Sequence, residues 1–174
     1  MFVQEYAETY GMNAIINRCG VLCGPGQFGK TDQGVFSLWV FHHLFQRPLK
    51  YQGYGGTGKQ VRDLLHPADL FTLIESQIAA KHLPKAALYN AAGGMPNSIS
   101  LQELTALCRE VTGREVGIAS QPETHGADLP YLVLDSSKAQ KEFGWKAKRS
   151  LKDIVTEIAA WAKANESELK SALS

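Results

Sequence analysis

The chain has 174 residues, of which 44% are hydrophobic and 20% charged, as is typical of a soluble globular protein. Eighteen basic and seventeen acidic residues give a formal net charge of +1 without a basic stripe, so nucleic acid is not an expected partner. No apolar run is long enough to span a bilayer, and no polybasic cluster marks a membrane surface. The first residues carry Glu5 and Glu8 in place of a signal-peptide core, so we expect a cytoplasmic protein.

Apolar periodicity and turn residues predict helices that alternate with strands, which is typical of an α/β fold. In chain order we expect a helix over 1–10, a strand over 13–23, a helix over 35–45, strands over 50–53 and 60–65, a helix over 67–80, a strand over 87–91, a helix over 101–112, strands over 115–120 and 131–134, and helices over 136–143 and 151–173.

The glycine-rich segment 53–59 imitates a phosphate-binding loop, because Gly53 is followed by four residues and then by Gly58 and Lys59. The next position should be the Ser or Thr that holds magnesium, and here it is Gln60. Residues 60–65 have the pattern of a strand and not of a helix. We therefore expect a glycine-rich hairpin that delivers Arg62 and Asp63 into a cleft.

A second glycine motif spans residues 24–29 and fits the G-x-G-x-x-G pattern of dinucleotide-binding loops. Pro25 suits that tight turn poorly, and residues 30–34 have the composition of a loop and not of a helix. We do not expect this segment to bind a dinucleotide.

The three cysteines do not predict a disulfide framework. Cys19 and Cys23 lie four residues apart on the expected strand 13–23, so their side chains should share one face and pack in the core. The five histidines show no zinc-protease spacing, and we expect no metal site.

Several short motifs occur together in one order along the chain: Tyr10-Gly11, Arg18 before Gly24-Pro25, Gln60-Val-Arg-Asp63, His66-Pro-Ala-Asp69, Tyr89-Asn90, Ser100-Leu-Gln-Glu-Leu104, Asp128, Asp135-Ser-Ser-Lys138 and Phe143-Gly144-Trp145. This ordered set resembles the C-terminal half of the extended short-chain dehydrogenase/reductases, the NAD-dependent nucleotide-sugar epimerases and dehydratases. Gln27-Phe28-Gly29 with Asp32-Gln33-Gly34 looks most similar to the CDP-sugar 2-epimerases that act on paratose and tyvelose.

The resemblance implies that residues 1–174 form a single unit: the C-terminal part of a Rossmann-type fold, truncated, with a small mixed α/β substrate-binding subdomain. The Tyr-x-x-x-Lys pair that serves as acid and base in this family is missing from the chain, as is the N-terminal glycine fingerprint for NAD. We therefore expect no catalytic residue in this chain. NAD is the cofactor of the family, but tight binding to this chain alone is not expected.

The resemblance also assigns roles to individual residues, with a pyrimidine nucleoside-diphosphate sugar as the implied partner. Arg62 stands where the family contacts the phosphates, and its forked guanidinium suits a pyrophosphate, although a salt-bridged surface arginine is the alternative. Asp63 is expected to brace neighbouring backbone. The remaining implied positions are Tyr54 or Tyr51 against the base, Gln27, Phe28 and Gln33 on the substrate loop, His125 and Asp128 near the phosphates, and Gly20 and Val21 beside the nicotinamide.

His125 replaces a second family arginine, so phosphate binding should be weaker near neutral pH. Two functions stay open. The chain is either the substrate-binding half of such an enzyme or a non-catalytic binding or self-assembly module derived from one. In either case we expect a homo-oligomer that buries apolar surface along residues 14–16 and the helix 35–45.

Overall fold

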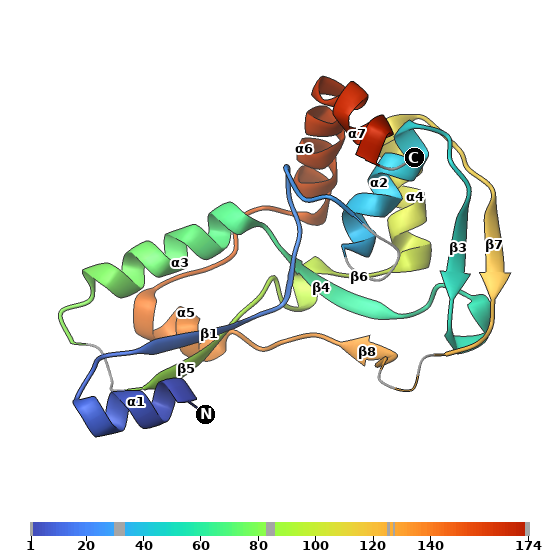
Figure 1. Ribbon diagram of the computed structural model, residues 1–174. Helices are drawn as coiled ribbons and strands as arrows, with labels where there is room; N and C mark the ends of the chain where they lie inside the picture. The colour runs from blue at the N-terminus through green and yellow to red at the C-terminus, as the bar shows by residue number, and fades with distance from the viewer. Residues whose placement is uncertain (1, 30–33, 83–85, 125, 127, 173–174) are drawn as a thin grey trace.

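The computed structural model describes residues 2–29, 34–82, 86–124, 126 and 128–172 (Figure 1). Its helices are α1 (Phe2–Tyr10), α2 (Val35–Leu44), α3 (Pro67–Ala79), α4 (Leu101–Thr112), α5 (Ser137–Phe143), α6 (Leu151–Ala164) and α7 (Glu166–Ala172), with short 3-10 helices η1 (Tyr54–Gly56) and η2 (Met95–Asn97). Its strands are β1 (Ile15–Cys19), β2 (Val21–Leu22), β3 (Leu49–Gln52), β4 (Val61–Leu65), β5 (Ala87–Ala91), β6 (Ser98–Ser100), β7 (Ile118–Gln121) and β8 (Tyr131–Leu132).

Local signals explain where the helices begin and end. Ser100 caps α4 in a capping box, in which its side chain accepts from the Glu103 amide and the Glu103 carboxylate accepts from the Ser100 amide. Gly113 ends that helix in the left-handed conformation, which costs glycine little. His66 caps α3 by accepting from the Ala68 amide, and Pro67 occupies the first helical position.

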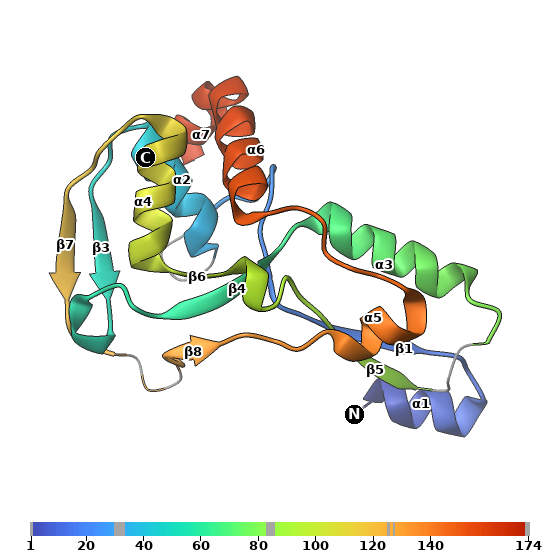
Figure 2. The same ribbon diagram turned by 180° about the vertical axis from the view of Figure 1, so that it is seen from behind.

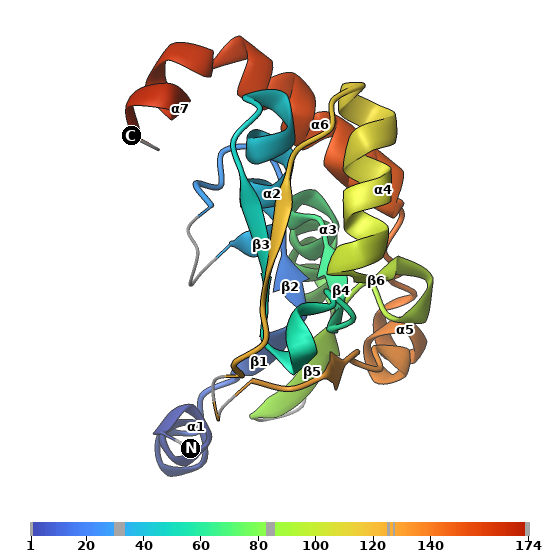
Figure 3. The same ribbon diagram turned by 90° about the vertical axis from the view of Figure 1, so that its right-hand side faces the viewer.

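The strands pair mostly in parallel, as an α/β fold requires. β1 pairs with β5, and β3 pairs with β7; Figure 3 shows this second pair side by side along α2 and α4. β4 pairs in parallel with β2 and β8, and in antiparallel with β6. β4 therefore joins three neighbours and is the central strand of its own sheet.

Two buried clusters form the core, and β4 contributes to both. The larger cluster lies among α2, α4 and α6 and includes Leu64, whereas the smaller one lies around α3, α5, β1 and β5 and includes Leu65. Consecutive strand residues point to opposite faces, so these two leucines anchor the two clusters from one strand. Whether residues 1–174 behave as a single unit stays a prediction.

The expected hairpin around the glycine-rich segment is wrong, because β3 and β4 do not pair with each other. The chain instead passes through η1 and packs onto β7, so closely that a Cβ on Gly56 would lie 1.9 Å from the Ser120 hydroxyl. Positive φ angles at Gly53, Gly58 and even Tyr54 bend this connection. Arg62 and Asp63 nevertheless lie on a strand, as expected.

Three other expectations need correction. The strand expected over 13–23 divides at Gly20, whose amide donates to the Ala91 carbonyl. Cys19 therefore packs against the smaller cluster, whereas Cys23 lies in the larger one. The side chains of the two cysteines do not share a face. The long terminal helix is interrupted at Asn165 and forms α6 and α7.

The expectation that the helix 35–45 exposes an apolar face is also wrong. Most residues of α2 are buried, since this helix packs between α4 and α6. Exposed apolar side chains lie instead on α1, which presents Phe2, Val3, Tyr6 and Tyr10, and on α3, which presents Phe71 and Ile78. Within the described residues, no helix is long and apolar enough to cross a membrane.

Candidate functional site

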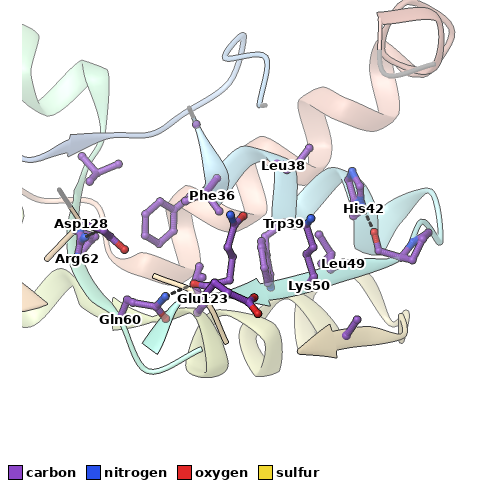
Figure 4. A pocket seen from close by; sticks show the side chains of 18 residues that line it. Phe36, Leu38, Trp39, His42, Leu49, Lys50, Gln60, Arg62, Glu123 and Asp128 are labelled. Atoms are coloured by element: carbon purple, nitrogen blue, oxygen red, sulfur yellow. Dashed lines mark hydrogen bonds and ion pairs between the residues drawn. The ribbon is translucent and has the colours of Figure 1, made fainter. Parts of the chain in front are cut away.

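A cavity of about 910 Å³ lies between α2, β3 and the start of β4 (Figure 4). Phe36, Trp39 and Leu101 give it an apolar wall. Its polar groups come from residues far apart in sequence, namely His42, Lys50, Gln52, Gln60, Arg62, Glu123 and Asp128. A cavity of this size, with an apolar wall and polar groups around it, suits a small organic ligand.

Arg62 is held in place at one end of this cavity. Its Nη2 lies 2.6 Å from Oδ1 of Asp128, and its Nη1 donates to the Val61 carbonyl at 2.8 Å. Asp128 is itself fixed, because the same Oδ1 accepts from the Leu129 amide at 3.0 Å. A guanidinium has five N–H donors, so these contacts leave others for an anion in the cavity. The ion pair fixes the direction of the fork.

Asp63 points to the opposite face of β4 and does not line the cavity. Its Oδ2 accepts from the Gly94 amide at 3.1 Å, and a Cβ on Gly20 would lie 2.8 Å from the same oxygen. The prediction that Asp63 braces neighbouring backbone is confirmed. Gly20 is needed here because any larger residue would meet this carboxylate.

The two tyrosines suggested for base stacking occupy different places. Tyr51 stacks on Trp39 with ring centroids 5.8 Å apart and bonds to the Thr105 hydroxyl, so it belongs to the core wall. Tyr54 donates from its hydroxyl to the Asp128 carbonyl at 2.6 Å. Tyr54 therefore supports the segment that carries Asp128, and it does not line the cavity.

Of the substrate-loop residues, Gln27 and Phe28 make internal contacts. Gln27 donates to the Leu22 carbonyl at 3.1 Å and accepts from the Ser37 hydroxyl at 2.9 Å. Phe28 meets Trp161 edge to face at 6.0 Å. Neither side chain lines the cavity, whereas Val21 does. Gln33 and His125 lie outside the described residues.

The cavity also contains polar residues that sequence reasoning did not place there, above all Gln60, Lys50 and Glu123. Gln60 stood out in the sequence only as the residue that breaks the phosphate-loop pattern. No local pattern marks the other two, because β3 and the segment after β7 meet only in the fold.

His42 is the titratable ring in the cavity wall. Burial lowers the pKa of its imidazole, although a contact of 2.8 Å between Nδ1 and the Pro48 carbonyl opposes this shift. His42 is therefore neutral at pH 7, and it provides no fixed positive charge for a phosphate.

The fold is that of the Rossmann-like sugar epimerases. UDP-glucose 4-epimerase from Thermotoga maritima, solved with UDP-glucose, superposes with a TM-score of 0.81 at 21% identity, covering 95% of this chain and 51% of that one. An epimerase from Methanothermobacter thermautotrophicus superposes with a TM-score of 0.86 at 16% identity, over 98% of this chain and 49% of that one.

Sequence comparison defines the family. Residues 1–92 match the NAD dependent epimerase/dehydratase family, and the chain belongs to it. CDP-paratose 2-epimerase of Salmonella typhi is 28% identical over 92% of this chain, and probable GDP-L-fucose synthase 1 of Oryza sativa subsp. japonica is 32% identical over 91%. The chain spans 48% and 47% of these two relatives, which is about half of their length.

Neither glycine-rich segment, 24–29 or 53–59, has the usual geometry for the pyrophosphate of NAD. A dinucleotide is normally held where a strand passes through a glycine-rich turn directly into a helix N-terminus. Segment 53–59 leads instead into β4, and a Cβ on Gly29 would lie 2.4 Å from the Leu38 amide nitrogen, so that glycine serves packing against α2. Among the described residues, no group of three acidic, histidine or cysteine side chains could hold a metal ion.

Proposed function

We propose that this chain is the substrate-binding half of an NAD-dependent nucleotide-sugar epimerase or dehydratase, and that its cavity holds the nucleoside diphosphate. The observation that carries this proposal is the Arg62–Asp128 pair at the end of the cavity. A partly buried, oriented guanidinium beside an apolar wall is what a ligand with a pyrophosphate at one end and a flat ring at the other requires.

The placement of charges supports this orientation. Arg62 can meet two phosphate oxygens with its remaining donors, while Asp128 keeps the fork in position. The wall formed by Phe36 and Trp39 continues away from that end, where an aromatic base can exclude water. Val21 lines the cavity on another side, next to Gly20, where the sugar would approach the nicotinamide in the complete enzyme.

The base is proposed to be a pyrimidine. The names of the similar proteins include CDP-, UDP- and GDP-linked sugars, so family membership alone leaves the base open. The proposal follows from the match of Gln27-Phe28-Gly29 to the CDP-sugar epimerases, and from the relative CDP-paratose 2-epimerase. A cytoplasmic location likewise stays a prediction.

The direct test is a titration of the 174-residue chain with CDP or UDP, followed by amide chemical shifts. Half of a cleft binds weakly, so we expect dissociation constants on the order of high micromolar to millimolar. Shifts should cluster along β3, around Arg62 and near Asp128. Arg62→Ala should reduce the affinity about tenfold, and Arg62→Lys should restore it only in part, since an ammonium cannot form the forked contact.

Arg47 offers a matched control, because it is a partly exposed arginine outside the cavity-lining set. Arg47→Ala should bind CDP and UDP as the unsubstituted chain does. Equal affinity of the unsubstituted chain and Arg62→Ala would contradict the proposal. The same would hold if the shifts gathered away from the cavity.

We also propose that the chain alone does not turn over a nucleotide sugar and does not bind NAD tightly. The missing Tyr-x-x-x-Lys pair and the packing of Gly29 against α2 support this view. Calorimetry with NAD should detect no binding in the low micromolar range. A low-micromolar dissociation constant, or measurable epimerisation by the purified chain, would contradict it.

The second candidate is a non-catalytic module that assembles with itself. One observation favours it: α1 buries only Ala7 and presents four large apolar side chains, with Phe2 exposed to 74%. Light scattering across a wide concentration range should then report a homo-oligomer. Tyr6→Glu on the exposed stripe should dissociate it, whereas Glu5→Gln should not. A monomer at all concentrations would exclude this candidate.

A further inference from the structure

The side chain of Gln60 has an acceptor without a donor. It is exposed to only 9%, and within the described part of the chain its Oε1 has no hydrogen-bond partner. Its Nε2 donates to the carbonyl oxygen of Gln52. Because a carbonyl can only accept, this contact fixes which end of the amide is nitrogen. Oε1 must therefore face the other way, where a buried acceptor without a partner is costly.

Gln60 lies in the wall of the cavity, close to the phosphate end. It stands two residues before Arg62 in an extended segment, so both side chains leave the backbone on the same side, about 7 Å apart. Figure 4 shows it between the Arg62–Asp128 pair and Trp39. Gly53 borders this place, and its φ of 81° favours glycine, although a Cβ there would make only an ordinary contact with the Gln60 Nε2 at 3.5 Å.

The chemistry of the neighbourhood limits what can satisfy Oε1. The phosphates of a nucleotide sugar are ionised and carry no hydrogen to donate. Phe36 and Trp39 also line the cavity, and although each is exposed to only 3%, the exposed part of each ring is an aromatic surface against which a flat ring can lie. A heterocycle lying on that wall has N–H groups at its edge. Such an N–H can donate to Oε1 of Gln60 while the ring lies against the aromatic wall.

We infer that Gln60 is a positioning residue for the base: its Oε1 accepts an N–H from the pairing edge of a pyrimidine while Arg62 holds the phosphates. This inference rests on the proposed function. The inference adds to the proposed function the orientation of the ligand in the cavity. It also adds a requirement on the base, namely an unblocked N–H at the 3- or 4-position. Cytosine presents its 4-amino group there, and uracil presents N3–H.

The experiment compares each base with and without that hydrogen. CDP is paired with N4,N4-dimethyl-CDP, and UDP with 3-methyl-UDP, in titrations of the 174-residue chain followed by amide chemical shifts. The unsubstituted chain should bind the parent nucleotide of its preferred pair roughly tenfold more tightly than the methylated one. Gln60→Met retains the length of the side chain and removes its carbonyl. In this variant the ratio of the dissociation constants of the methylated and parent nucleotides should fall at least about fivefold, because only the steric effect of the methyl group remains.

Gln102→Met is the matched control, since Gln102 is an exposed glutamine on α4 outside the cavity lining. It should show the ratio of the unsubstituted chain. If Gln60→Met kept the full ratio, or the unsubstituted chain bound methylated and parent nucleotides alike, the inference would be overturned. Loss of affinity in Arg62→Ala would still support the proposed function in that case. Equal affinity in Arg62→Ala would overturn both.

A measurement on the unsubstituted chain covers the case in which Gln60→Met does not fold. The side-chain amide resonances of Gln60 should shift on saturation with the preferred parent nucleotide, and clearly less with its methylated form. Equal shifts with both members of the pair would contradict the inference without any substitution.

Discussion

Removing the carboxylate of Asp69 should destabilise the protein far more than removing an exposed carboxylate from the same helix. Asp69 lies in the first turn of α3 and is exposed to only 2%. It accepts from the amides of Lys148 and Arg149 at 3.1 and 3.0 Å, and Arg149 Nη1 lies 3.2 Å away. It thereby fastens the chain between α5 and α6 to α3, and Figure 2 shows that connection running alongside the helix.

The magnitude follows from the partners that Asp69→Ala would leave behind. The backbone N–H groups of the exposed Lys148 and the partly exposed Arg149 would lose a charged acceptor that is itself buried, and each donor left without a partner costs about 1–3 kcal/mol. Arg149 is about one-third exposed and keeps contact with Glu157, so its charge adds little. We expect a loss of about 2–5 kcal/mol in the free energy of unfolding, out of a typical total of about 5–15 kcal/mol.

Urea unfolding monitored by tryptophan fluorescence and circular dichroism measures this loss, provided that the slope with denaturant stays constant. Asp69→Asn retains one carbonyl acceptor and should lose less than Asp69→Ala. Glu75→Ala removes an exposed carboxylate from the same helix and should change stability by no more than about 0.5 kcal/mol. If Asp69→Ala unfolded at the same urea concentration as Glu75→Ala, the proposed role of this carboxylate would be refuted.

Three further predictions concern stability. Burial lowers the pKa of His66, although Glu157 opposes this shift. Neutral His66 therefore contributes stability above about pH 6.5, and this stability is lost as the pH falls toward the lowered pKa of the folded state. Thermal unfolding between pH 7 and 5 should show a weaker pH dependence in His66→Asn, whose side chain still offers an acceptor to cap α3. Leu64→Ala should cost about 2–5 kcal/mol in urea unfolding, whereas Ile78→Ala, at 78% exposure, should cost under about 0.5 kcal/mol. Ser100→Ala should cost about 1 kcal/mol by the same measurement, because it removes the capping box of α4.

The sequence predicted most elements whose signals are local. The sequence predicts the helix 101–112 with its observed bounds because Ser100, Glu103 and Gly113 act within a few residues of its ends. The strand 87–91 was likewise placed correctly. Strand pairing depends on residues far apart in sequence, so the sequence could not show that β3 pairs with β7 and not with β4. A glycine-rich segment between two strands resembles a hairpin until the partner strand is known.

The candidate site was predictable only in part, for the same reason. The resemblance placed Arg62, Asp128 and Val21, and all three line the cavity. It could not show that the side chain of Gln27 hydrogen-bonds to the Leu22 carbonyl and the Ser37 hydroxyl, because these contacts depend on how α2 packs. Gln60 could not be found at all from its sequence context. Its importance comes from an oxygen without a partner, which is a property of the folded structure.

The alternation of side chains along β4 explains why fold and site are inseparable in this chain. Arg62 faces the cavity and Leu64, on the same side, enters the larger cluster, whereas Asp63 and Leu65 face the smaller cluster and the Gly94 amide. A shift of this strand by one residue would exchange the two faces, placing Asp63 in the cavity and burying Arg62. The pairing of β4 with β2, β6 and β8 holds that register. Strand pairing therefore determines that the positive charge of Arg62, and not the negative charge of Asp63, lines the cavity.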